Sequence, residues 1–175
     1  MNRNPLCCDD RYLKPGELLC PERPSLISTI LGSCVAITLY DHHAPLGGIC
    51  HAVLPYSNGK QDARYVDQAL RRMLDCFDRA GIRRGNIAAK LFGGADTMPM
   101  TAWHGKEEIG AVGRKNISAA LELLAREGLR IAASDVGGLE GRRIFFYSHT
   151  GEIFLKRFPI RESGSRLSSL RARIS

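Results

Sequence analysis

The residues best suited to chemistry in this sequence are a cysteine at a bend and a histidine in a later apolar run. Cys34 directly follows Gly32 and Ser33 at the start of one apolar run, and His51 follows Cys50 in the next. An imidazole within reach of a thiol is the minimum for nucleophilic catalysis by cysteine. Backbone N–H groups near the bend can also bind an oxyanion beside the thiol. The pattern therefore predicts a cysteine nucleophile with a histidine base.

Both residues also have a purely structural interpretation. Free cysteine is among the most buried residue types, and a histidine on a strand is often a hydrogen-bonded core residue. Residue types and spacing alone leave both interpretations open. If His51 is protonated, it lowers the pKa of the Cys34 thiol below the ordinary value of about 8.5. In that case Cys34 should react with iodoacetamide faster than Cys7 or Cys8 does at neutral pH.

A metal site is a third interpretation of this region. Its ligands would come from Cys34, His42, His43, Cys50 and His51. Adjacent residues on a strand face opposite sides, which separates Cys50 from His51. The paired-ligand spacing of zinc sites is also missing. We therefore expect neither a metal ion nor another cofactor.

The composition is typical of one soluble domain. A chain of 175 residues, 44% of them hydrophobic, fits a single domain with its own core. Its apolar runs are shorter than the roughly 18 to 20 residues of a membrane-spanning helix. The N-terminus also lacks the apolar stretch of a secretory signal. We expect a cytoplasmic protein without membrane insertion, in which the six cysteines are thiols.

The net charge of +7 raises the question of nucleic-acid binding. Part of that charge lies in residues 161–175, which contain four arginines and one glutamate. Elsewhere the basic residues are dispersed, and no recognisable nucleic-acid-binding motif is present. We therefore expect no nucleic-acid partner. The boundaries we expect are a flexible arm over residues 1–12, a domain over 13–160 and a basic tail over 161–175.

Apolar periodicity predicts the elements that must position Cys34 and His51. Alternation at period two predicts strands over residues 26–31, 35–39 and 48–54, so that His51 lies on a strand that can pair beside the strand after Cys34. Spacings of three and four predict one helix over 63–80, capped by Asp62, and another over 107–127. Further strands are expected over 87–92, 130–136, 142–148 and 152–158, with a loop over 95–105.

The second predicted helix has an apolar stripe that should face the core. Its members are Ile109, Val112, Ile117, Ala120, Leu121 and Leu124. With only two substantial helices, the element order predicts an α/β fold of one domain. We expect a layered sandwich of mixed or antiparallel β-sheet, not a doubly wound nucleotide-binding fold.

Several motifs together resemble the CheD family of chemoreceptor glutamine deamidases. The first two are the run Ser28–Ala36, which contains the cysteine, and the run Gly47–Pro55, which contains the histidine. Five shorter motifs follow the same family pattern in the same order: Lys14–Glu17, Lys90–Ala95, Asp135–Gly138, Gly141–Arg143 and Thr150–Glu152. The resemblance covers roughly residues 11–160, and several independent motifs in order make it specific.

The resemblance implies roles for individual residues. It makes Cys34 the nucleophile and His51 the base, and it implies a third residue, a threonine shortly before the cysteine. Residue type favours Thr29 for this third position, whereas spacing without a gap favours Ser28. Adjacent strand residues point to opposite faces, so only one of the two hydroxyls can meet the histidine. We favour Thr29.

The resemblance also implies an activity and partners. The activity is hydrolysis of specific glutamine side chains of methyl-accepting chemotaxis receptors to glutamate, with release of ammonia, through a cysteine thioester. The backbone at Gly32 and Ser33 would bind the oxyanion. The partners would be the cytoplasmic region of chemoreceptors and a CheC-type phosphatase. The alternative is a non-catalytic chemotaxis adaptor that binds receptors or that phosphatase, but retention of both Cys34 and His51 favours the enzyme.

Overall fold

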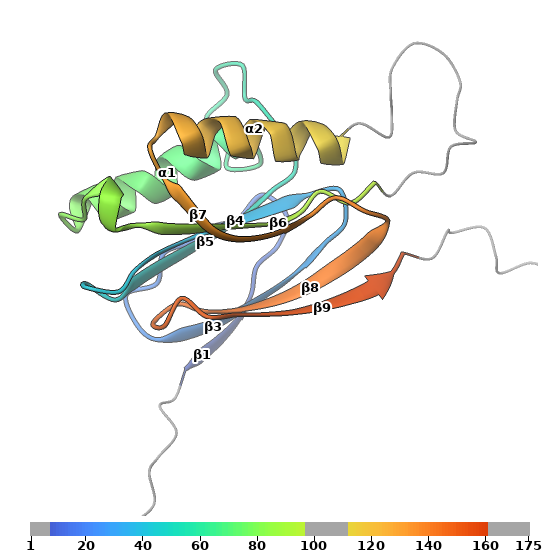
Figure 1. Cartoon of the computed structure of the whole chain (residues 1–175). Coiled ribbons are helices and arrows are strands. Elements are labelled where there is room, and N and C mark those ends of the chain that lie inside the picture. The colour runs from blue at the N-terminus through green and yellow to red at the C-terminus, as the bar shows by residue number, and fades with distance from the viewer. Residues whose placement is uncertain (1–7, 97–111, 161–175) are drawn as a thin grey trace, which may run out of the picture.

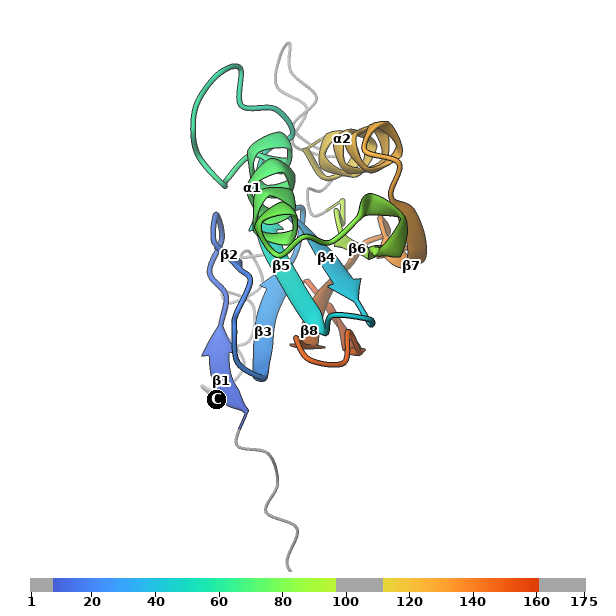
Figure 2. The ribbon, with the colours of Figure 1, turned by 90° about the vertical axis from the view of Figure 1, so that its left-hand side faces the viewer.

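The protein is built from three layers: two helices, a five-stranded sheet and a four-stranded sheet (Figure 1). The computed structural model describes residues 8–96 and 112–160. The helices α1 (Val66–Arg79) and α2 (Val112–Arg126) lie side by side on one face of the five-stranded sheet (Figure 2). The four-stranded sheet lies on its other face. This arrangement confirms the predicted layered α/β fold with two main helices.

The two sheets are both mixed. The four-stranded sheet has the order β1 (Asp9–Tyr12), β3 (Ser25–Leu31), β8 (Glu140–Tyr147) and β9 (Ile153–Pro159). The five-stranded sheet has the order β2 (Leu18–Leu19), β5 (Leu46–Ala52), β4 (Val35–Asp41), β6 (Ala88–Gly93) and β7 (Arg130–Val136). The pairs β1–β3 and β6–β7 are parallel, and the others are antiparallel. A short 3-10 helix, Arg84–Asn86, precedes β6.

The consecutive strands β3 and β4 belong to different sheets, so the bend between them crosses from one layer to the other. Alternation along β4 buries both of its faces. Val35, Ile37 and Leu39 pack toward the helices, whereas Ala36 packs between the two sheets. The core between the sheets contains Leu13, Ile27, Leu31, Ala36, Ile49, Phe92, Ile144 and Phe146. The candidate site residues enter this inter-sheet core.

Part of the predicted N-terminal arm is a strand. Residues 9–12 form β1, which pairs in parallel with β3, and Leu13 is completely buried between the sheets. All four side chains of β1 are exposed. An exposed edge strand needs no apolar alternation, and this explains why the periodicity did not predict β1. Residues 1–7 and the predicted tail over 161–175 lie outside the described residues.

The helices differ from the predictions at their starts and in one buried position. The first helix begins at Val66, because the Asp62 carboxylate accepts the backbone N–H of Arg64 in a turn before the helix and does not cap it. On α2, Leu121 is exposed, whereas Leu123 is buried. The predicted residues 107–111, including Ile109, and most of the predicted 95–105 loop lie outside the described ranges.

None of the helices within residues 8–96 and 112–160 combines the length and the apolar character that crossing a bilayer requires. Both helices are instead amphipathic and cover the five-stranded sheet with their apolar sides. The apolar residues of the helices are therefore used in the core of the domain.

Candidate active site

The bend Gly32–Cys34 places the candidate nucleophile at the junction of the two sheets. Residues 32–34 leave β3 in the four-stranded sheet and lead into β4 of the five-stranded sheet. The Cys34 side chain is half-buried and packs against the inter-sheet core. A thiol at the rim of the core can meet a substrate from outside while its base stays buried.

The strand β5 brings His51 to the same face of the sheet as Cys34. His51 pairs with Ala36 across the antiparallel β4–β5 ladder, and Cys34 lies two residues before Ala36. Such diagonal neighbours lie about 7–8 Å apart, within reach of long side chains. The predicted pairing of the histidine strand beside the strand after Cys34 is confirmed.

Hydrogen bonds from the N-terminal segment fix the backbone of His51 on its other side. The His51 N–H donates to the Glu17 carbonyl at 2.9 Å, and the Gly16 N–H donates to the His51 carbonyl at 2.8 Å. The residue as a whole is 1% exposed. The histidine therefore has little freedom to move as a whole, and only its ring torsions remain to be set.

The Thr29 hydroxyl sets the ring of His51. Its oxygen lies 2.8 Å from Nδ1 of His51, and the hydroxyl donates to the Leu13 carbonyl, also at 2.8 Å. A carbonyl only accepts, so the single hydroxyl proton belongs to that bond. The threonine oxygen must then accept the proton of Nδ1. This arrangement leaves Nε2 as the lone-pair nitrogen, the form that a general base requires.

The other hydroxyl, that of Ser28, does not meet the histidine. Thr29 shares the alternation of the inward residues Ile27 and Leu31, so Ser28 points to the opposite face of β3. The structure therefore joins Thr29 to His51, places Cys34 on the same face of the five-stranded sheet as His51, and separates Ser28 from them. Among the described residues, the buried Nε2 atom of His51 has no hydrogen-bond partner, so it makes no hydrogen bond to Cys34 in this structure.

Burial determines the protonation states of His51 and Cys34. Burial lowers the pKa of His51 to about 4, although the Leu13 carbonyl and the Glu17 carboxylate act in the opposite direction. Burial also raises the pKa of the Cys34 thiol, against the influence of its own backbone N–H. Both residues therefore rest neutral at pH 7. A protonated His51 was the condition for faster alkylation of Cys34, and this condition is not met at neutral pH, because neither charge is solvated or paired.

The lowered pKa of His51 predicts a loss of stability in mild acid. Well above about pH 6.5, the ordinary histidine pKa, both the folded and the unfolded histidine are neutral. As the pH falls from there towards 4, only the unfolded chain takes up this proton, so folding becomes less favourable. Between pH 7 and pH 5 we expect a loss of about 2 kcal/mol from this group. Urea unfolding of the parent and of His51→Gln at both pH values measures it, and an equal loss in both proteins would contradict this origin.

All three carbonyls of the bend accept hydrogen bonds, two from the segment that follows β6 and one from α2. The Gly32 carbonyl accepts the Ala95 N–H at 2.8 Å, and the Cys34 carbonyl accepts the Gly94 N–H at 2.7 Å. The Ser33 carbonyl accepts a side-chain N–H of Asn116 at 3.0 Å. Within the described part of the chain, the N–H groups of residues 32–34 donate to no carbonyl or side-chain oxygen. Such N–H groups are the donors that our prediction for Gly32 and Ser33 requires for an oxyanion.

The close packing around the bend requires glycine at position 93. The Gly93 φ is +97°, and a Cβ atom there would lie 2.3 Å from the Cys34 carbonyl oxygen. A larger residue would therefore push the bend away from β6. Gly93 directly follows the predicted strand over 87–92, a position that gave no sign of a part in the site.

Two further residues of the site were missed from the sequence. Leu13 contributes a backbone carbonyl, for which no residue type gives a signal. Asn116 is a fully buried polar residue on the apolar side of α2, three and four residues before Ala119 and Ala120. A polar residue at helical spacing within a buried stripe is the signal that could have found it.

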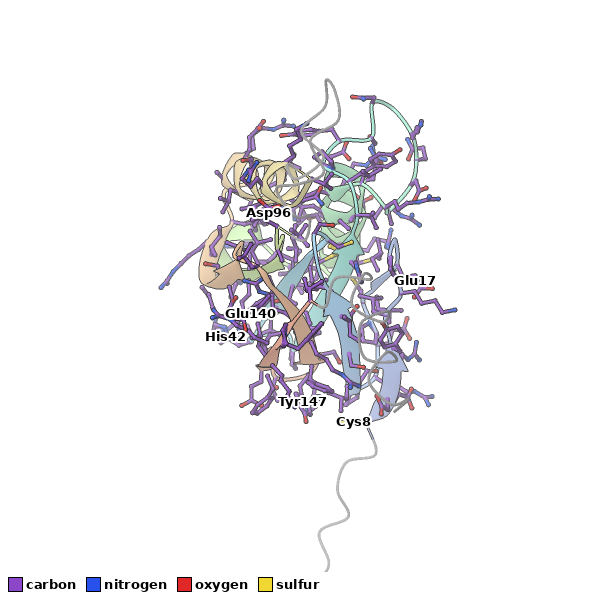
Figure 3. All side chains as sticks on the ribbon, turned by 90° about the vertical axis from the view of Figure 1, so that its right-hand side faces the viewer. Cys8, Glu17, His42, Asp96, Glu140 and Tyr147 are labelled. Carbon is purple, nitrogen blue, oxygen red and sulfur yellow. The ribbon has the colours of Figure 1, made fainter. Side chains whose placement is uncertain are left out.

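The cysteines and histidines of the metal interpretation do not converge. His42 and His43 follow the far end of β4 from Cys34, and Figure 3 shows His42 at the rim of the molecule. Cys50 is buried and faces the helices, away from His51. Among the residues placed by the structure, no three His, Cys, Asp or Glu side chains come together as a metal site.

The arrangement of Cys34, His51 and Thr29 can be compared with known families. The family model described as "CheD chemotactic sensory transduction" matches residues 53–157, which is more than half of the chain. This chain belongs to the CheD family. The match to the CheD model begins two residues after His51 and therefore does not include Cys34 or His51. The longer alignment with the first of the individual relatives below includes both residues.

Curated CheD relatives align with nearly the whole domain. "Probable chemoreceptor glutamine deamidase CheD 2" of Geobacter sulfurreducens is 44% identical over 154 residues, which cover 88% of this chain and 93% of the relative. A CheD protein of the same description from Sulfurimonas denitrificans is 37% identical and covers 85% and 94%. One from Methanococcus maripaludis is also 37% identical and covers 83% and 93%.

Proposed function

We propose that this protein is a chemoreceptor glutamine deamidase with Cys34 as nucleophile and His51 as base. Membership of the CheD family supports the activity, since the relatives are named for it. The contact between Thr29 and Nδ1 of His51 is the observation that carries the assignment of residues. This contact leaves Nε2 of His51 as a hydrogen-bond acceptor. His51 lies on β5, which pairs with β4, the strand that follows Cys34.

The first half of the reaction releases ammonia. The Cys34 sulfur attacks the carboxamide carbon of a glutamine side chain while His51 Nε2 takes the thiol proton. The N–H groups at Ser33 and Cys34 bind the oxyanion that forms. His51 then gives its proton to the leaving nitrogen, the C–N bond breaks, and the acyl group stays on sulfur as a thioester.

The second half consumes one water. His51, neutral again, takes a proton from water as the oxygen attacks the thioester carbonyl. The C–S bond breaks, the sulfur recovers its proton from the histidine, and the side chain leaves as glutamate. Thr29 keeps Nδ1 protonated throughout, which holds Nε2 as the proton-transfer atom. A neutral hydroxyl orients the ring but offers the imidazolium less stabilisation than a carboxylate would.

The substrates of this reaction are the cytoplasmic regions of chemotaxis receptors, which places the protein in the cytoplasm. Each turnover adds one negative charge to a receptor. A CheC-type phosphatase is a further partner, and nucleic acid is not one. The dispersed basic charge and the family membership support this set of partners.

The deciding experiment is incubation of the full chain with purified receptor cytoplasmic fragments. Peptide mass spectrometry should find specific glutamines converted to glutamates, with a matching release of ammonia. Binding to the fragments without any conversion would support an adaptor instead of the enzyme. Neither binding nor conversion across fragments from several receptors would contradict the proposed function altogether.

The contact of Thr29 with His51 predicts different effects for the two neighbouring hydroxyls. Thr29→Ala frees the ring to rotate but keeps nucleophile and base, so we expect kcat to fall by about 10- to 100-fold. Ser28→Ala removes a hydroxyl from the other face of β3 and should change kcat by less than about twofold. Thr29→Ser keeps the hydroxyl and should restore most of the activity. A larger loss in Ser28→Ala than in Thr29→Ala would reverse the assignment.

A further inference from the structure

We infer that Asn116 on α2 is a positioning residue that aims the oxyanion-binding N–H group of Cys34. The inference rests on the proposed deamidase function. Asn116 is completely buried, and its side-chain nitrogen makes two hydrogen bonds. One reaches the Ser33 carbonyl at 3.0 Å, and the other reaches the Val53 carbonyl at 2.9 Å.

These two bonds connect the segments that carry the nucleophile and the base. Ser33 directly precedes Cys34, and Val53 lies two residues after His51. An amide nitrogen has two protons, and both are used here. Asn116 therefore fixes the distance between the bend and the end of β5 from a third element, α2.

The geometry of the peptide bond converts this contact into a direction for the catalytic N–H. The Ser33 carbonyl and the Cys34 N–H belong to one planar, trans peptide unit, so they point in opposite directions. Holding the carbonyl toward α2 turns the N–H away from α2. The Ala95 N–H acts in the same way on the Gly32 carbonyl, at 2.8 Å, and so orients the N–H of Ser33.

The choice of residue at position 116 is explained by donation and not by packing. Within residues 8–96 and 112–160, no donor reaches the buried Asn116 Oδ1 atom, which is unfavourable. Asparagine is also a weaker helix former than the alanines and leucines around it. A neutral side chain with two N–H donors must be an amide. The unpaired oxygen is therefore the cost of supplying both donors without a charge.

The start of α2 is held close to the bend. At Gly113, one turn before Asn116, a Cβ atom would lie 2.6 Å from the Gly94 carbonyl oxygen and 2.7 Å from that of Ala95. The helix backbone therefore rests directly on the segment that binds the other two carbonyls of the bend. Figure 3 shows Asp96, the next residue, beside α2, where Arg114 binds its carboxylate at 2.7 Å.

The test compares two reactions of Cys34 in Asn116→Leu, which keeps the branching and the number of side-chain heavy atoms and removes both donors. Deamidation of receptor fragments forms an oxyanion, whereas alkylation by iodoacetamide displaces iodide and forms none. We expect kcat for deamidation to fall by about 10²- to 10³-fold, as when an oxyanion donor is lost. KM and the rate of Cys34 alkylation should stay within about twofold of the parent.

The matched control is Gln68→Leu on α1. Gln68 is also a buried helical amide, and its nitrogen donates to the Ser57 hydroxyl at 2.9 Å, away from the bend. This variant should lose stability and keep kcat. Asn116→Ala serves as the second variant where Asn116→Leu does not fold.

Each outcome decides a different statement. A selective loss of kcat supports the positioning role. A kcat near that of the parent overturns the positioning role. Parallel losses of deamidation and alkylation, or the failure of both Asn116 variants to fold, also overturn it, because either result indicates a structural role. Absence of deamidation by the parent protein contradicts the proposed function and not the positioning role.

Discussion

Cys34→Ala is expected to abolish deamidation while the protein keeps its fold. The thiol is the group that we propose forms the covalent intermediate, and the bend itself is held by its backbone carbonyls, which this change leaves intact. Loss of a nucleophile lowers kcat on the order of 10⁴-fold or more. Ammonia release from receptor fragments measures the effect, and circular dichroism checks the fold.

The control for this change is Cys50→Ala. Cys50 is completely buried on the helix side of β5, and burial raises the pKa of its thiol to about 12. We expect this variant to lose stability through poorer packing and to keep its activity. Full activity in Cys34→Ala would end the assignment of the nucleophile. Total loss of activity in a folded Cys50→Ala protein would equally contradict it.

His51→Gln is the second change with a large expected effect. It removes the group that takes the thiol proton and later protonates ammonia, so kcat should fall by about 10²- to 10⁴-fold. His149→Gln is the matched control, because His149 also has a buried ring nitrogen with no partner among the described residues but lies in the turn between β8 and β9. Activity in His51→Gln equal to that in the control would contradict the role of the base.

The pH profile of the parent enzyme also tests the assignment of His51 as the base. His51 must be neutral to accept the thiol proton, and its pKa of about 4 keeps it neutral throughout the physiological range. We therefore expect kcat/KM to fall on the acid side only near pH 4. Because the pKa of Cys34 is raised, kcat/KM should stay constant from neutral into alkaline solution. An acid limb near 6.5 would indicate a solvated histidine instead.

Alternation along the strands predicted most of the site. The pairing of β4 with β5 follows from two apolar runs at period two, and it brings Cys34 and His51 to one face. The choice between Ser28 and Thr29 was harder, because both phases of β3 contain large apolar residues. Ile27 and Leu31 share the phase of Thr29, but Leu26 and Ile30 share that of Ser28, and Ile30 proves to be 44% exposed. Only the packed structure decides which phase is the inner one.

The protonation states could not be read from residue types. A cysteine beside a histidine suggests an ion pair, but the degree of burial determines whether either charge is stable. Likewise, the sequence marks Gly32 and Ser33 as a bend without telling where their carbonyls bind. That information comes from Ala95 and Asn116, which are distant in the chain and meet the bend only when α2 and β6 are in place.

Because β3 and β4 belong to different sheets, the activity depends on how the two sheets pack against each other. Thr29 belongs to the four-stranded sheet and His51 to the five-stranded sheet, so their contact exists only while the inter-sheet core is fully closed. A compact state that keeps its secondary structure but loosens its packing would separate the hydroxyl from the ring. Substitutions deep in that core, at Ile144 or Phe146 for example, can therefore change the reaction rate without touching substrate. The reaction rate in this fold therefore depends on the tight packing of both sheets and not only on the residues of the site.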